Sequence, residues 1–336
     1  MKHLRLAAGL ALSVALIAWL LRSVNLPELG RQLALTDWPW VLPAAAVAPL
    51  GVWARAIRWR YLYPPGLRPP GLVAANMIGY MANNILPLRA GELVRVYVAA
   101  RRYRVERRAP MSTGFWLAAA TILVERVLDG VALVLILAVL VLLIPVPATF
   151  KWAAVVMLAI DVVTTAVLVA LAVAPQPCQR VVARLTRRRP ALAARAARAV
   201  DVMLQGLDGV RAPSHLLPIL AWTLVIWATA ALSAWALLRA VHLDLPVIAG
   251  WTVLTFVGFG ISLPSAPGYV GVWHAANVLA LAIFGVSQTQ ALGYAVLYHA
   301  SQYVTITLTG WLFLLREHVS LGEATAAPRV GEDAAV

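Results

Sequence analysis

Three ionisable residues interrupt a long apolar stretch near the middle of the chain. Glu125, Arg126 and Asp129 lie close together, and Arg126 can reach Asp129 across one helical turn. Charged side chains in an apolar helix cost free energy unless they pair with one another or line a polar path. We expect them either to bind a charged ligand or carry a proton, or to form a structural ion-pair network that fixes helix packing.

A second group of charges follows a proline. Pro87 precedes Arg89, Glu92 and Arg95, and on a helix that starts near residue 90 the last two share one face. An acidic residue at this depth is typical of the interior of a bundle. The arginines can therefore engage an anion beside the proline, although arginines at the end of a membrane span are also ordinary cytosolic anchors.

The elements that carry these charges are predicted to be transmembrane helices. Of the 336 residues, 62% are hydrophobic and only 12% are charged, whereas soluble domains carry about 25% charged residues. Apolar runs recur, several of them close to the ~20 residues that a helix needs to cross a bilayer. These runs are 4–21, 41–54, 127–144, 152–174, 216–238 and 291–315. The sequence predicts an all-α, polytopic transmembrane helix bundle with about six full spans.

The basic residues indicate how the bundle is oriented. A net charge of +14 would suit a nucleic-acid partner, but the arginines lie in short loops between apolar runs, as the positive-inside rule expects. We therefore expect no nucleic acid, a multi-pass protein of the cell membrane (inner or plasma membrane), and cytosolic N- and C-termini. The single cysteine, Cys178, and the scattered histidines give no metal-ligand spacing. No Gly-x-x-x-x-Gly-Lys-Ser/Thr motif is present, so we expect no cofactor, no metal and no ATP hydrolysis.

Two apolar segments are interrupted by prolines and glycines. Residues 71–87 lie between two arginine clusters on one side of the membrane, and residues 247–285 must begin and end on the other. In each segment, Leu-Pro is followed by a glycine four residues after the proline. We expect two broken re-entrant hairpins in a possible inverted repeat, which is a sign of a transporter site. Half-helix N-termini at such breaks favour anions.

The remaining polar segments are predicted to lie in the cytosol. Residues 175–213 form a basic loop in which apolar residues recur at helical spacing, as expected for an amphipathic helix on the membrane surface. We expect residues 1–316 to form a single transmembrane domain and residues 317–336 a disordered cytosolic tail. Asp161, alone in the 152–174 run, is either a proton-coupling or a packing residue. His299 and Gln302 share one helix face and could line a cavity.

Three motifs, in this order, resemble those of one family. They are residues 84–95 (NILPLRAGELVR), the Glu125-Arg126 pair with Asp129, and residues 264–271 (PSAPGYVG). Together they resemble the lysylphosphatidylglycerol synthase transmembrane family. It comprises the flippase-like domain of the multiple peptide resistance factor and many stand-alone, mostly uncharacterised membrane proteins. The resemblance covers roughly residues 5–316.

The resemblance implies a flippase-like domain that handles lipids. In this family the flippase domain moves aminoacylated phosphatidylglycerol between leaflets, and other relatives are implicated in handling polyprenyl-linked lipids. No large soluble synthase domain follows residue 316, so we expect this chain not to be an enzyme. Many relatives carry a glutamate at the position that matches His274, so an acidic role does not transfer to it.

These observations predict a lipid flippase-like transporter for an anionic or aminoacylated phospholipid, or for a polyprenyl-linked lipid. The arginines would engage a headgroup phosphate, and the carboxylates would hold them in place and could contact a cationic headgroup. The expected substrate-binding residues are Asn84, Arg89, Glu92, Arg95, Glu125, Arg126, Asp129, Pro267, Gly268, Tyr269, Gly271 and His274. Two alternatives stay open: a membrane-embedded lipid-modifying transferase, and a non-catalytic partner subunit of a separate lipid synthase. Membrane lipids are the expected partners, and a homo-oligomer is possible.

Overall fold

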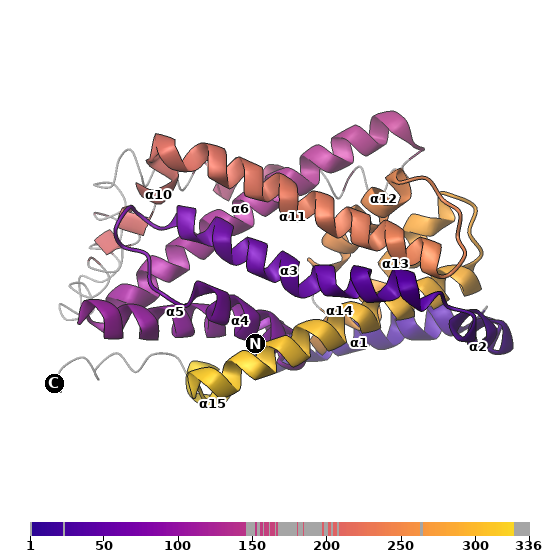
Figure 1. The fold of residues 1–336 in the computed structure, drawn as a ribbon, viewed down its shortest axis with the longest axis horizontal. Coiled ribbons are helices and arrows are strands. Elements are labelled where there is room, and N and C mark those ends of the chain that lie inside the picture. Colours follow the sequence, from indigo (N-terminus) through magenta and orange to yellow (C-terminus); the bar gives the residue numbers. More distant parts are fainter. Residues whose placement is uncertain are drawn as a thin grey trace.

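The chain folds as an elongated bundle of helices. A computed structural model describes residues 2–22, 24–145, 208–262 and 265–325, together with scattered positions between 152 and 206. These residues form helices and connecting turns, and none of them lies in a β-strand. Most of the long helices run along the longest axis of the molecule (Figure 1). The predicted all-α class is confirmed for the described part of the chain.

Three helices are long and apolar enough to cross a bilayer. They are α3 (Trp38–Leu62), α6 (Met111–Leu143) and α11 (Pro213–Ala240). Large apolar side chains stay exposed on their outer faces, for example Leu50, Leu142 and Leu217. Extended apolar faces of this kind are unfavourable in water but compatible with lipid tails. The protein is therefore a membrane protein.

The described residues do not by themselves account for the expected six crossings. A fourth span is added if α1 (Lys2–Leu21) and α2 (Leu26–Ala34), which meet at 91°, are counted as one bent crossing. The described residues thus support three or four apolar spans. The 152–174 run lies mostly outside the described residues. The last expected span lies in α14 (Gln288–Glu317), whose many hydroxyl and amide side chains make this helix less apolar than α3, α6 and α11.

The first broken segment forms a helical hairpin. Its parts are α4 (Leu72–Ile85), the short 3-10 turn η1 (Pro87–Arg89) and α5 (Gly91–Arg107). Pro87 has no N–H with which to continue α4, and the residue before it is extended (φ −92°, ψ 145°). Gly91 lets α5 begin close against α4, because a Cβ there would overlap the carbonyl oxygen of Gly79. The hairpin is longer than the predicted 71–87 segment, since α5 continues through arginines expected in a loop.

The second broken segment forms a similar hairpin. Its parts are α12 (Ile248–Ile261), the 3-10 turn η2 (Pro267–Tyr269) and α13 (Val272–Ala282). Gly268 and Gly271 adopt positive φ angles of 68° and 87°, a region that glycine enters without steric penalty. The Leu263-Pro264 pair lies outside the described residues. Both helices are therefore interrupted in the segments where the sequence predicts a break.

The two hairpins occupy opposite halves of the molecule. In Figure 1, α4 and α5 lie toward the left and α12 and α13 toward the right. Each half has its own apolar core: the first hairpin packs with the first half of α6, and the second packs with α11 and the second half of α6. Because η2 contacts both α4 and η1, the tips of the hairpins meet between the two cores. Ser13 of α1 also reaches this point, where its hydroxyl accepts a hydrogen bond from the Ala266 N–H (2.9 Å).

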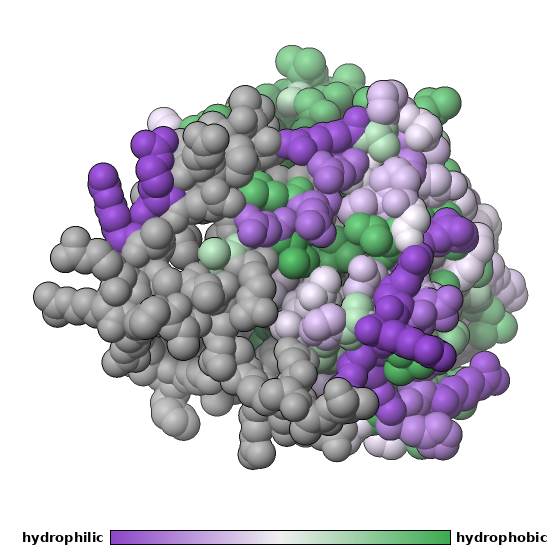
Figure 2. Space-filling model, turned by 90° about the vertical axis from the view of Figure 1, so that its left-hand side faces the viewer, coloured by the Kyte–Doolittle hydropathy of each residue, from purple (hydrophilic) through white to green (hydrophobic). Residues whose placement is uncertain are grey.

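The two ends of the bundle differ in charge. The left-hand end in Figure 1 holds the ends of α3, α5 and α14 and the start of α11, and its described residues include nine arginines and three carboxylates. They are Arg60, Arg68, Arg101, Arg102, Arg104, Arg107, Arg108, Arg211 and Arg316, with Glu106, Asp208 and Glu317. At the opposite end the described charges balance: Arg22, Arg31 and Arg239, with Glu28, Asp37 and Asp244. Figure 2 looks onto the arginine-rich end, where hydrophilic side chains cover much of the described surface.

Part of the expected disordered tail is ordered. Helix α15 (Leu321–Thr325) follows α14 and packs against α5, and Val319 and Ala324 are buried. The prediction of disorder from residue 317 onward therefore does not hold for this segment, because its apolar side chains find a surface to cover. Residues 326–336 lie outside the described part of the chain, as does most of the predicted 175–213 loop, which ends near α10 (Asp208–Arg211).

Candidate functional site

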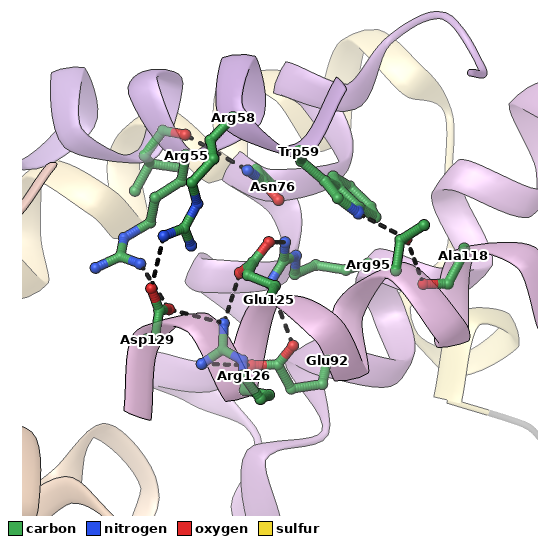
Figure 3. A network of polar contacts seen from close by, with 12 residues as sticks. Arg55, Arg58, Trp59, Asn76, Glu92, Arg95, Ala118, Glu125, Arg126 and Asp129 are labelled. Atoms are coloured by element: carbon green, nitrogen blue, oxygen red, sulfur yellow. Dashed lines mark hydrogen bonds and ion pairs between the residues drawn. The ribbon is translucent and has the colours of Figure 1, made fainter. Parts of the chain in front are cut away.

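Charged side chains from three helices meet inside the bundle (Figure 3). We call them the charge network: Arg55 and Arg58 of α3, Glu92 and Arg95 of α5, and Glu125, Arg126 and Asp129 of α6. The structure thus joins both charge groups that the sequence singles out. Two further arginines, from α3, complete the set.

The centre of the charge network is the ion pair of Arg95 and Glu125, whose side chains are both fully buried. Two hydrogen bonds join them, from Nη1 to Oε1 (3.0 Å) and from Nη2 to Oε2 (2.9 Å). The guanidinium also lies over the Trp59 ring, 4.7 Å from its centroid. Gly79 leaves room for this arrangement, because a Cβ there would overlap the Arg95 side chain. Removing either partner would leave a buried charge without its bidentate partner, so the pair is costly to break.

Asp129 connects α6 to α3. Arg55 Nη1 lies 2.9 Å from Asp129 Oδ2, and Arg58 Nη1 lies 2.8 Å from Oδ1. The two arginines are three positions apart, so one face of α3 presents both to the same carboxylate. Arg58 is fully buried and also donates to Thr223 Oγ1 (3.2 Å), which ties α11 to the charge network.

Arg126 contacts all three carboxylates of the charge network. Its guanidinium nitrogens lie 2.6 Å from Glu125, 3.6 Å from Glu92 and 3.8 Å from Asp129. Its side chain is 39% exposed, whereas that of Arg95 is fully buried. Arg126 therefore lies at the edge of the charge network, with part of its side chain accessible to a ligand or to solvent.

Arg55 and Arg58 are the residues that sequence reasoning missed. In the sequence they follow the 41–54 apolar run and resemble cytosolic anchors at the end of a span. Periodicity is the signal that separates them from anchors, since apolar residues surround them and their spacing places both on one face of a continuing helix. Because α3 extends to Leu62, both arginines lie inside the bundle.

A cavity of about 430 Å³ adjoins the charge network, which is within the usual size range of small-molecule sites. Its charged lining consists of Arg55, Arg89, Glu92, Arg126 and Asp129. Much of the remaining lining is apolar and comes from α3, α6, α11 and α12, including Val47, Leu133, Ile226, Leu254 and Val257. A cavity with both kinds of lining suits a molecule that has a charged head and an apolar body.

Arg89 links the two breaks. It adopts a positive φ of 55°, which is uncommon for a residue other than glycine. Its Nη2 donates to the carbonyl oxygen of Ile261 at the end of α12, and its guanidinium lies 5.7 Å from the centroid of the Tyr269 ring. Of the three arginines that line the cavity, Arg89 alone has no carboxylate partner in the described part of the chain.

The second hairpin and α14 contribute aromatic and imidazole side chains. A ring nitrogen of His299 lies 2.8 Å from the Gly268 carbonyl oxygen, and the ring stacks on Trp273 with centroids 5.2 Å apart. His274 packs edge-on against His299 at 5.0 Å but does not line the cavity. This side of the cavity is therefore lined by aromatic rings and by a histidine that is hydrogen-bonded to the backbone.

The structure divides the predicted site residues into groups. Those that line the cavity are Asn84, Arg89, Glu92, Arg126, Asp129 and Tyr269. Those that lie behind the lining, in the charge network, are Arg95 and Glu125. Those at the second turn that do not line the cavity are Pro267, Gly268 and Gly271, with His274 beyond them. Asp161 lies outside the described residues.

Two of these residues have evident structural roles. Asn84 donates to Thr307 Oγ1 (2.9 Å) and so holds the first break against α14. Gly268 lies against Tyr303, whose ring would be 2.8 Å from a Cβ at that position.

As for metals, no group of three or more His, Cys, Asp and Glu side chains in the described ranges is placed to hold an ion.

These features define a helical membrane protein with a charged cavity where two broken helical hairpins meet. The chain belongs to the family described as the lysylphosphatidylglycerol synthase TM region, whose model matches residues 6–310. This confirms the family that the motifs suggest.

A comparison with curated proteins finds one relative. The chain is 34% identical over 132 residues to a protein named Glycosyltransferase AglD from Haloferax volcanii. The match covers 38% of this chain and 20% of that protein, so it spans about a fifth of the relative's length. No solved structure matches the chain significantly.

Proposed function

We propose that the protein moves a lipid between bilayer leaflets as a flippase-like transporter. The cavity carries this proposal, because it combines charged and apolar lining inside a bundle with lipid-facing helices. A phosphate headgroup would lie against the arginines, while the lipid tails would extend along the apolar lining into the bilayer. Ionisable residues within membrane segments commonly mark substrate paths. The substrate would be an anionic or aminoacylated phospholipid, or a polyprenyl-linked lipid.

The two hairpins would be matching parts of an inverted repeat, within a single domain of residues 1–316 that has about six full spans. In support of this, each hairpin has its own core and their tips meet beside the cavity. In transporters built from such repeats, broken helices form the substrate site, and one half moves against the other to alternate access.

We place the arginine-rich end and both termini in the cytosol, with the protein in the cell membrane. The contrast between nine arginines at one end and balanced charges at the other supports this orientation. Transport would be passive or ion-coupled and would need no enzyme activity, cofactor or metal in this chain. A separate lipid synthase that supplies the substrate, and a second copy of the chain, are the partners that we propose.

Leaflet exchange in reconstituted vesicles tests the proposal. Phosphatidylcholine vesicles with a trace of tail-labelled phosphatidylglycerol would contain the wild type, Arg89→Ala or Glu125→Gln, and external quenching would report how fast inner-leaflet label appears outside. We expect exchange with the wild type and loss of exchange in both variants, after size-exclusion chromatography has verified that they are folded.

Arg31→Gln is the matched control for this experiment. Arg31 is 68% exposed at the balanced end and pairs with Glu28, far along the chain from the charge network. Vesicles with this variant should exchange lipid at the wild-type rate. If labelled phosphatidylglycerol, lysyl-phosphatidylglycerol and polyprenyl phosphate all exchange no faster than in protein-free vesicles, the transport proposal is wrong.

A second candidate function is a lipid-modifying transferase, favoured by the name of the Haloferax relative, a glycosyltransferase. Such an enzyme generally needs a carboxylate that is free to act as a base. The carboxylates of the charge network are engaged by arginines, which favours transport over this alternative. A lipid product of increased mass after incubation with a nucleotide sugar would reverse the preference.

A further inference from the structure

Every carboxylate oxygen in the charge network lies at ion-pair distance from a guanidinium nitrogen. The oxygens of Glu125 lie 2.6 Å and 2.9 Å from arginine nitrogens, and those of Asp129 lie 2.8 Å and 2.9 Å from theirs. The oxygens of Glu92 are 3.2 Å and 3.6 Å from arginine nitrogens. Each carboxylate charge is therefore matched by at least one arginine at ion-pair distance, although Oδ1 of Asp129 accepts no hydrogen bond among the described atoms.

The arginines, by contrast, exceed the carboxylates. Counting Arg89 with the charge network, five arginines face three carboxylates, which leaves an excess of two positive charges. Arg89 has only a backbone carbonyl and an aromatic ring as described partners. Arg126 is paired with carboxylates, but its side chain is 39% exposed. Both arginines line the cavity, so the excess charge is presented to a ligand.

We infer that the cavity binds lipids whose headgroup phosphate gives them a net negative charge and discriminates against headgroups that carry an amine, including aminoacylated ones. This inference rests on the proposed lipid transport and narrows its substrate. A phosphate would receive charge-assisted hydrogen bonds from Arg89 and Arg126, in the forked geometry that guanidinium groups favour. An ammonium group would lose its hydration beside excess positive charge, and every carboxylate there is already matched by an arginine.

Two kinds of lipid present this phosphate chemistry. A glycerophospholipid such as phosphatidylglycerol offers a phosphate diester, and a polyprenyl phosphate offers a monoester on a single long chain. The arginines can bind either group, so separate arms of one experiment must distinguish them.

Equilibrium binding tests the inference separately from transport. The detergent-solubilised full-length protein would be titrated with phosphatidylglycerol, lysyl-phosphatidylglycerol or polyprenyl phosphate, and occupancy would be read by native mass spectrometry. We expect at least one anionic lipid to bind about tenfold or more tightly than lysyl-phosphatidylglycerol, since a hydrogen bond to a charged group contributes about one to two factors of ten. If only one of the two anionic lipids binds more tightly, that result shows whether the cavity recognises a phosphate diester or a phosphate monoester.

Substitutions at Arg89 make the test specific to the site. Arg89→Gln should weaken binding of the anionic lipid by about tenfold, whereas Arg89→Lys should retain most of it because the charge is kept. Arg89→Glu would leave four arginines against four carboxylates, one of them unpaired in the cavity, and should shift the preference toward lysyl-phosphatidylglycerol. Arg31→Gln should bind all three lipids as the wild type does.

The outcomes separate the two proposals. Equal or tighter binding of lysyl-phosphatidylglycerol, or no binding of any of the three lipids, overturns the headgroup inference. Anion-selective binding that depends on Arg89 supports it even if vesicles show no exchange, in which case only the transport proposal fails. Conversely, exchange of anionic and lysyl lipids at equal rates, with unselective binding, supports transport and refutes the selectivity.

Discussion

The two hairpins share a similar break but differ in chemistry. The segment 72–107 carries eight charged residues, and two of them, Glu92 and Arg95, enter the charge network. The segment 248–282 contains no Asp, Glu, Lys or Arg at all. At the second hairpin, glycine turns, aromatic rings and histidines take the place of ion pairs.

This difference shows that a broken helix does not by itself decide what its site recognises. Both breaks open the backbone of a helix, but the first hairpin is held by ion pairs with α6, which is paired in turn with α3. The second is held by close packing, as where Gly268 meets Tyr303. The first hairpin should therefore be sensitive to unpaired charge, and the second to added volume.

The largest effect is expected from Glu125→Leu. This change leaves the buried guanidinium of Arg95 without its bidentate partner, which costs about 3–5 kcal/mol of stability. Thermal unfolding in detergent, followed by size-exclusion chromatography, should show a marked fall in the midpoint. The double variant Arg95→Met/Glu125→Leu should recover much of the loss, because it removes both charges. If the single and double variants were equally destabilised, the stability of the first hairpin would depend mainly on packing and not on unpaired charge.

Gly268→Ala should have the next largest effect and acts on the second hairpin. The alanine must adopt a positive φ, and its Cβ would lie 2.8 Å from the Tyr303 ring, so we expect a loss of about 2–3 kcal/mol. Gly285→Ala is the control, because φ there is also positive (75°) but nothing lies within 4 Å of its Cβ. The same thermal measurement should show a smaller loss for Gly285→Ala, and equal losses would mean that strain alone matters.

His299→Phe should cost about 1 kcal/mol, the usual contribution of one hydrogen bond. The variant loses the contact with the Gly268 carbonyl oxygen but can keep the stacking on Trp273. His274→Phe is the comparison, since the described contacts of His274 are ring packing and include no hydrogen bond. A smaller change in unfolding midpoint for His274→Phe would support this account. If His274→Phe were instead the more damaging variant, the second hairpin would hold a polar contact beyond those described.

Glu317→Gln should have the smallest effect. It breaks the ion pair with Arg102, which lies near the C-terminal end of α5, away from the break. There the Glu317 oxygens lie 2.6 Å and 2.8 Å from guanidinium nitrogens. The hydrogen bonds raise the pKa of Arg102, so the arginine stays charged at any working pH. Arg102 is 43% exposed, so the loss should be below about 1 kcal/mol and should vanish in high salt. A loss as large as that of Glu125→Leu would contradict the distinction between buried and exposed charges.

Much of the architecture could be predicted from local patterns in the sequence. The apolar lengths indicate membrane helices, and Pro87 interrupts α4 because it cannot donate the next hydrogen bond. The charges at residues 125–129 were recognisable because carboxylates are costly within an apolar run. The order of α15 was not predictable, since burial of Val319 and Ala324 depends on the surface of α5.

The sequence by itself determined the membrane class, the family and the positions of both breaks, because these follow from composition, spacing and the conformational limits of proline and glycine. Only the tertiary structure decided which charges pair. Arg55 and Arg58 meet Asp129 across 71–74 residues of chain, and Arg89 meets the carbonyl of Ile261 across 172 residues. Such pairings depend on how the helices pack, and no local pattern encodes a distance between residues so far apart in the sequence.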